Sequence, residues 1–287
     1  MKTDLRKKTA AKKITAAQLV FFILLALMLA MVFLPLLFVV NTSFKDPVEY
    51  VLNPVGINFS ALRPRNYTDV LQANNLITSM VNSIIVTVIA VFCSVVTTAL
   101  ISFAIGVIRF KGSQIIFYIA ICSMFLAGEI TMIPMYMLYS KLNLIGKLWS
   151  LILPSFIGLP GLGIMVGSSY IRGIPREIHE AAFIDGAGVP QVFFKIDLHM
   201  LVPVLALTAV MTFQGNWGNF LWPYVTVLSN REAHTFAITL LQFKSQNASM
   251  YGQYCAGLVI MTLPIVLVYC FCSKYFMQGM AAGAVKG

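Results

Sequence analysis

Apolar residues dominate six long stretches of this chain, and shorter polar segments separate them. The stretches cover approximately residues 19–40, 78–106, 115–138, 148–170, 201–227 and 252–276. Each is long enough to cross a hydrocarbon core, which takes about 20 residues of helix. Lipid cannot hydrogen-bond to the backbone, so continuous stretches of this length predict helices rather than the short alternating strands of a barrel. The pattern therefore predicts an all-α, polytopic membrane helical bundle with six transmembrane helices.

The composition supports this fold class. Hydrophobic residues make up 59% of the 287 residues and charged residues only 10%, and the mean hydropathy is +0.85. These values lie outside the range of soluble domains. The five cysteines all fall in predicted spans without a CxxC pair, which favours packing over disulfide or metal chemistry. We expect a single transmembrane domain over residues 19–287, preceded by a basic tail at residues 1–18.

Positive charge near the N-terminus predicts the orientation. Six of the 20 Lys and Arg residues precede the first stretch, and such clusters stay in the cytoplasm. The tail at residues 1–18 is therefore predicted to be cytoplasmic, and six spans return the C-terminus to the same side. The other basic residues divide evenly between the two sides, so the prediction depends on the tail. A basic tail beside anionic lipid accounts for much of the net charge of +10, and no other patch indicates a nucleic-acid partner.

The polar segment between the fourth and fifth stretches carries boundary signals of a short helix. Pro175 suits a first helical turn, and Gly186 suits a C-terminal stop. A helix of about ten residues fits between them, on the predicted cytoplasmic side. The segment is isolated between apolar stretches, so we interpret this helix as a docking element.

On a period of 3.6 residues, one face of the predicted helix contains Ile178, Ala181, Ala182 and Asp185. The alanines allow close approach to a groove on another protein. Glu180 and Asp185 can pair with basic residues of that protein, which fixes the register more than it adds affinity. An interfacial helix resting on the bilayer explains the amphipathicity equally well. The acidic groups argue against that alternative, because anionic lipid repels them.

Polar residues within two predicted spans suggest a substrate pathway. Glu129 is the only acidic residue near the middle of a span, and its cost in lipid predicts that it faces a cavity or a partner. At about 1.5 Å per residue, Glu129 and Asn216 lie roughly 21 and 24 Å along their helices and share one layer. Gln214, Trp217 and Asn219 add hydrogen-bonding groups and an aromatic face, as a sugar requires. Packing between helices explains these residues equally well, and both interpretations stay open.

Several motifs together resemble the inner-membrane permease subunits of carbohydrate ABC importers of the maltose type, in particular the second of their two permeases. The most specific is Glu180-Ala181-Ala182, with Gly186 six residues after the glutamate and an Ile-x-Leu that begins at Ile196. The others cover nearly the whole chain: NTSFK at 41–45, NY at 66–67, NS at 82–83, IPMY at 133–136, IPRE at 174–177, FLWP at 220–223 and GAVKG at 283–287.

Three positions depart from the pattern of that family. The chain has His199 where the family usually has a proline, and it has Trp217-Gly218-Asn219 where the family usually has Trp-Asn. The first difference affects the entry into the fifth span, and the second puts the role of the asparagine in doubt. The family generally has an amide at the position of Glu129, so a carboxylate there could bind an arginine of the partner permease or a distinctive substrate.

The resemblance implies a multi-subunit importer in the bacterial inner membrane. A second permease would complete the pore as a heterodimer, and an extracytoplasmic solute-binding protein would deliver a sugar. Two copies of an ATP-binding subunit would dock on a coupling surface of five residues, Glu180, Ala181, Ala182, Asp185 and Gly186. This chain lacks a GxxxxGK[ST] loop, so ATP and Mg are expected to be used by that subunit, while this chain binds no cofactor and is no enzyme.

An alternative function is a channel or a proton-coupled secondary carrier that uses Glu129. A carrier is expected to have more than one buried ionisable group as a relay, and it needs no exposed loop helix rich in acidic residues and alanine. A membrane-embedded enzyme lacks paired carboxylates, metal ligands or a nucleophile with its base.

Overall fold

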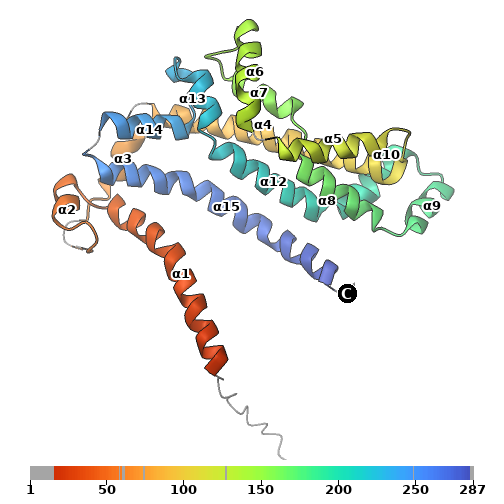
Figure 1. The fold of residues 1–287 in the computed structure, drawn as a ribbon, viewed down its shortest axis with the longest axis horizontal. Helices are drawn as coiled ribbons and strands as arrows, with labels where there is room; N and C mark the ends of the chain where they lie inside the picture. The colour runs from red at the N-terminus through yellow and green to blue at the C-terminus, as the bar shows by residue number, and fades with distance from the viewer. Residues whose placement is uncertain are drawn as a thin grey trace, which may run out of the picture.

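The computed structural model describes residues 16–57, 59, 62–73, 75–126, 128–247 and 249–284, and its regular elements are all helices (Figure 1). Most of the basic tail predicted at residues 1–18 lies outside the described residues. The main elements are α1 (Ala16–Ser43), α2 (Pro47–Leu52), α3 (Arg65–Gln72), α4 (Leu76–Phe103), α5 (Ser113–Phe125), α6 (Gly128–Lys141), α7 (Trp149–Ile157), α8 (Gly161–Arg172), α9 (Arg176–Ile184), α10 (Val189–Val192), α11 (Leu198–Met200), α12 (Val202–Trp217), α13 (Leu221–Val227), α14 (Phe236–Gln246) and α15 (Tyr251–Ala284).

Four of the predicted spans form continuous helical segments that are long and apolar enough to cross a membrane. They are Gln18–Ser43, Leu76–Ile108, Trp149–Arg172 and Tyr251–Ser273. The count reaches six when each of two bent pairs is taken as one span: Ser113–Phe125 with Gly128–Lys141, and Val189–Met200 with Val202–Trp217. The all-helical membrane fold is therefore confirmed, with four to six candidate spans among the described residues.

The third and fifth spans differ from their predicted form. The third is bent by 100° between α5 and α6, so Glu129 lies in the first turn of α6 and not in the middle of a continuous helix. The fifth ends at Trp217, and a separate helix α13 begins at Leu221. Gly128 and Gly218 at these breaks are poor helix formers, and hydrophobicity alone does not reveal a bend. The depth comparison between Glu129 and Asn216 along straight helices is accordingly wrong.

The centre of the bundle consists of α4, α8 and α12, which pack closely side by side (Figure 1). Gly163 and Gly167 of α8 lie in this contact, and a Cβ at Gly167 would overlap Ser102 of α4. Small residues let helix backbones approach in this way inside membranes. The GxxxG spacing of Gly163 and Gly167 thus coincides with close packing of α8 against its neighbours.

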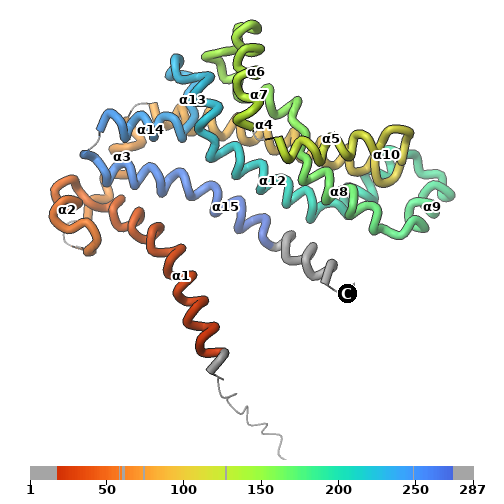
Figure 2. Tube along the Cα trace, in the orientation of Figure 1, coloured from red at the N-terminus to blue at the C-terminus, as the bar shows by residue number. Residues whose placement is uncertain are grey.

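The helix α1 diverges from this centre (Figure 2). The most apolar part of its candidate span, Gln18–Ser43, is not buried against the rest of the chain. The end of α1 meets α15, where a Cβ at Gly252 would overlap the carbonyl of Lys45. The short helices α2, α3 and α14 lie at this end of the molecule, and α9 lies at the opposite end (Figure 1). The segments that contain α2 and α3 and the segment that contains α14 thus lie together, away from the predicted docking helix.

Candidate functional site

The predicted docking helix is α9, which starts directly after Pro175 and runs to Ile184. Pro175 has an extended backbone at the N-cap, which agrees with its tolerance for the start of a helix. At the other end Gly186 has a φ of +81°. Its N–H donates to Phe183 O at 3.1 Å, and the N–H of Ala187 donates to Ala182 O at 3.0 Å. This is the Schellman arrangement, in which a left-handed glycine satisfies the last carbonyls of a helix.

Besides Arg176, Ile178 and Phe183, five exposed residues lie on α9 or directly after it: Glu177, Glu180, Ala181, Ile184 and Asp185. Ile184 is 85% exposed. An apolar centre framed by carboxylates is the composition expected of a protein-docking patch rather than of a helix facing anionic lipid. We call these five residues the α9 patch.

The inward face of α9 is narrow and contains His179, the only side chain of this helix that is buried. Ala182 is partly buried, and it packs against a core cluster that includes Ile171, Val192 and Leu201. The two alanines thus have different surroundings: Ala181 is exposed, whereas Ala182 holds the helix against its own bundle. The exposed side of α9 thus includes Glu177 and Ile184, whereas Ala182, which was predicted to share the docking face, is partly buried.

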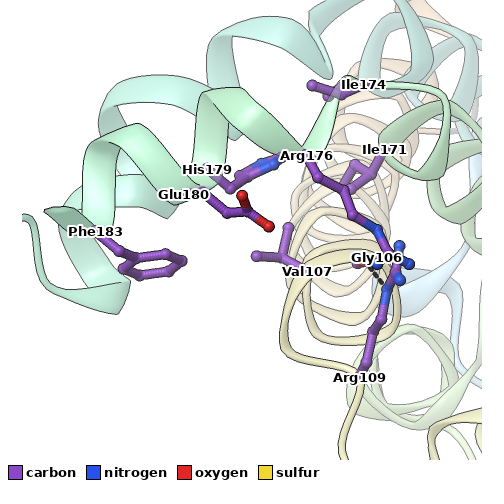
Figure 3. Close-up of a pocket in the computed structure, with 9 residues that line it drawn as sticks. All are labelled: Gly106, Val107, Arg109, Ile171, Ile174, Arg176, His179, Glu180 and Phe183. Carbon is purple, nitrogen blue, oxygen red and sulfur yellow. Dashed lines mark hydrogen bonds between the residues drawn. The ribbon is translucent and has the colours of Figure 1, made fainter.

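A cavity of about 220 Å³ separates α9 from the ends of α4 and α8 (Figure 3). Arg176, His179 and Glu180 line it from α9, and Arg109 lines it from the segment that follows α4 (Figure 3). The guanidinium of Arg109 donates to Gly106 O at 2.9 Å. Within the described part of the chain, Glu180 forms no ion pair. Its carboxylate therefore remains open to a cationic group of another protein.

A second cavity, of about 260 Å³, lies where α6, α7 and α13 meet. Glu129 lines it from the first turn of α6, where a helix N-terminus favours a negative charge. Asn219 lines it from the connection between α12 and α13, and Trp222 lines it from α13. The structure thus brings Glu129 and Asn219 to one cavity, and we call this cavity the polar cavity.

A smaller cavity of about 60 Å³ adjoins the polar cavity and shares Pro154, Asn219 and Trp222 with it. Asn216 lines this smaller space, and its amide donates to Thr212 O at 2.9 Å within α12. Asn216 and Glu129 thus line two different cavities that have these three residues in common.

Trp217 and Gln214 lie away from both of these cavities. Trp217 is 3% exposed, stacks on Phe213 and donates from Nε1 to Met261 O at 2.8 Å. Gln214 is exposed on α12. Trp217 therefore joins α12 to α15, and the aromatic side chain at the polar cavity is Trp222, which donates from Nε1 to Ser150 O at 3.0 Å.

Residues 98–282 of this chain match the sequence profile described as the binding-protein-dependent transport system inner membrane component. That match covers more than half of the chain and includes α8, α9 and α12. This chain belongs to that family of permeases. It is accordingly a multi-pass permease of the inner membrane, part of an ABC transporter complex that depends on a binding protein, and not itself an ATPase.

Individual relatives of the permease cover nearly its whole length. The arabinooligosaccharides transport system permease protein AraQ of Halalkalibacterium halodurans is 31% identical over 256 residues, which are 88% of this chain and 91% of AraQ. The AraQ protein of Bacillus subtilis is 30% identical, over 91% of this chain and 93% of the AraQ sequence. The diacetylchitobiose uptake system permease protein NgcG of Streptomyces coelicolor is 26% identical, over 92% of this chain and 87% of NgcG.

The fold of the permease resembles a chain in the crystal structure of a bacterial ABC transporter involved in the import of the acidic polysaccharide alginate. The TM-score is 0.76 at 20% identity, and the alignment covers 91% of this chain and 98% of that chain. The family match decides against the alternative of a channel or proton-coupled carrier that works through Glu129.

Sequence reasoning omitted three residues of the permease's candidate sites. Glu177 and Ile184 belong to the α9 patch, and a helical period centred on buried His179 would have placed both opposite it. Trp222 belongs to the polar cavity. The FLWP motif that contains it can be read from the sequence, but no local pattern indicates that Trp222 rather than Trp217 lines a cavity. Which of two neighbouring aromatic residues lines a cavity depends on the break after Trp217.

Proposed function

We propose that this chain is one of two permease subunits in an ATP-driven importer of sugars or oligosaccharides. It would form half of the translocation pathway with a second permease, and two copies of an ATP-binding subunit would drive it. An extracytoplasmic binding protein would deliver the substrate. In this arrangement the chain has six spans, with both termini and α9 in the cytoplasm.

The exposed α9 patch is the observation that carries this proposal. It presents Ala181 and Ile184 between carboxylates at one end of the bundle, on a helix fixed by Pro175 and the capping glycine. An apolar surface of this kind, with acidic groups that form no ion pair among the described residues, supports docking of a partner protein that carries basic residues. The ATP-binding subunit is the partner that family membership supplies.

The polar cavity supports the pathway half of the proposal. Glu129 and Asn219 provide hydrogen-bonding groups there, and Trp222 provides an aromatic ring. Sugars bind through both kinds of group, because their hydroxyls need donors and acceptors and their C–H faces pack on rings. Asn216 adds a further amide beside the cavity, whereas we leave Gln214 and Trp217 out of the proposed contact set.

The substrate class is supported by the relatives' names, which specify arabinooligosaccharides, diacetylchitobiose and starch degradation products. We infer alternating access as the mechanism. Closure of the ATPase pair would push α9, and the helices attached to it would move between two packed arrangements that open the pathway on opposite sides. The free energy of ATP binding would thus be spent on a change in helix packing.

The docking proposal is tested by co-purifying the permease complex with its ATP-binding subunit after Ala181→Arg and, separately, Glu180→Lys. We expect a loss of retained ATPase of roughly tenfold, which corresponds to about 1.4 kcal/mol. Ala181 is the better target, because an arginine at Ala182 would also disturb the permease's own core.

Glu232→Lys is the matched control. This exposed glutamate precedes α14, which lies at the opposite end of the molecule from α9 (Figure 1). It should leave ATPase retention unchanged. Undiminished retention in both α9 variants would refute docking at this patch, and uptake that continues without ATP would refute the importer.

A further inference from the structure

His179 and Asp197 form a buried pair between α9 and the segment that leads into α12. Nε2 of His179 lies 2.9 Å from Oδ1 of Asp197, and the two side chains are 11% and 0% exposed. Asp197 ends a π-helical turn over Phe193–Asp197, and α11 and α12 follow it directly. A hydrogen bond between residues 18 positions apart therefore fastens the coupling helix to the base of a long bundle helix.

The His179–Asp197 pair is the main polar contact between α9 and the bundle. Among the described residues it is the one side-chain hydrogen bond or ion pair that joins α9 to another element. The other contacts of α9 with the bundle are apolar, such as that of Ala182 with the core. Apolar contacts are non-directional, whereas a hydrogen bond holds its two partners at a defined distance and angle. The pair can thus transmit a pull as well as a push.

The burial of Asp197 makes the link costly to break. Its second oxygen, Oδ2, is buried and has no hydrogen-bond partner among the described residues. Separation from His179 would leave the carboxylate buried without any side-chain partner, and an uncompensated buried charge is strongly unfavourable. A displacement of α9 is therefore more readily followed by Asp197 than accommodated by rupture of the pair.

The element beyond Asp197 reaches the proposed pathway. The backbone N–H of Leu201 donates to Asp197 O at 2.8 Å, which ties the turn to the start of α12. The segment bends by 71° here. At its other end α12 contains Asn216, and Asn219 of the polar cavity lies two residues after the end of the helix. A shift at Asp197 is thus applied to the base of the helix whose far end borders the cavity.

We propose that Asp197, acting through His179, is a positioning residue that converts movement of α9 into movement of α12. This inference rests on the proposed function, since it assumes that an ATP-binding subunit moves α9. It adds that transmission runs through one buried polar contact rather than through the apolar packing of the loop.

The test uses the full complex with the ATP-binding subunit in lipid. The five native cysteines are replaced by alanine, and Thr131, an exposed residue of the polar cavity, is replaced by cysteine. The readout is the change in labelling rate by a membrane-impermeant maleimide on addition of ATP with vanadate. ATPase retention and ATP hydrolysis are measured in the same preparations.

The decisive variant is His179→Leu combined with Asp197→Val, which removes the link without leaving a buried charge, so that the chain folds. We expect retained ATPase and ATP hydrolysis, with the nucleotide-dependent change in labelling reduced by about fivefold or more. Asp197→Asn keeps an acceptor for the imidazole N–H and should retain most of the change. His199→Ala, an exposed histidine two residues away, should behave as the unaltered complex.

An undiminished change in the double variant would overturn the inference. So would a loss of ATPase retention in the double variant together with Asp197→Asn, because that result assigns the pair to folding or docking. Failure of the proposed function looks different: the unaltered complex would then bind no ATPase or show no nucleotide-dependent change at all.

Discussion

Gly163 of α8 lies against Thr208 of α12, so that a Cβ on the glycine would be 2.5 Å from Thr208 Oγ1. Oγ1 of Thr98 on α4 would be 2.6 Å from the same atom. Three helices from distant parts of the sequence therefore meet at a position where only hydrogen fits. This contact joins α12 to α4 and α8. Because it is so close, we expect the movement proposed for α12 to carry α4 and α8 with it.

Gly163→Ala should destabilise the permease, because the added methyl group overpacks a junction of three helices. We expect a loss of about 1–3 kcal/mol, measured as a lower midpoint of thermal unfolding in detergent. Gly215→Ala is the control, since nothing lies within 4 Å of a Cβ at that position of α12. Helix propensity predicts that it is neutral or stabilising by up to about 1 kcal/mol. Equal effects of the two substitutions would contradict the packing argument.

Gly186→Ala should loosen the end of α9, because the left-handed conformation at φ +81° costs an alanine about 1–2 kcal/mol. Hydrogen exchange of the α9 amides should become faster, while exchange in α4 stays the same. Gly188→Ala is a matched control two residues away, where φ is −73° and a Cβ meets only ordinary contact. Similar exchange rates in both variants would show that the capping glycine is dispensable.

Trp222→Phe and Trp217→Phe should differ in kind. The first removes the indole from the polar cavity and the bond to Ser150 O, so we expect a higher KM for uptake by the reconstituted complex. The second removes the bond to Met261 O in the interior, which should lower stability by about 1 kcal/mol and leave KM unchanged. A raised KM in Trp217→Phe alone would reverse these assignments.

Glu129→Gln should change the transport of charged oligosaccharides far more than that of neutral ones. The carboxylate in the polar cavity repels an acidic sugar, so its removal should raise uptake of acidic oligosaccharides roughly tenfold, about 1.4 kcal/mol. Thr131→Ala, at an uncharged position of the same cavity, should not discriminate between the two classes. Equal effects of Glu129→Gln on acidic and neutral sugars would exclude recognition of charge.

The ends of helix α9 could be predicted to within about one residue, because its boundary signals are local. Pro175 and Gly186 act through their own backbone conformations, and those are properties of the residue type. The side of the helix that faces the bundle could not be predicted. Ala181 and Ala182 are residues of the same type, and only the tertiary structure shows which of them contacts the bundle. The same limit applies to Trp217 and Trp222.

The sequence by itself determined that this chain is a helical membrane protein and a permease of its family, since apolar length and short motifs are properties of consecutive residues. Only the tertiary structure decided that α5 and α6 bend apart, that Glu129 and Asn219 line one cavity, and that His179 contacts Asp197. The physical reason is that these relationships depend on how helices pack. Packing is set by the combined fit of many distant side chains, which no local pattern along the chain encodes.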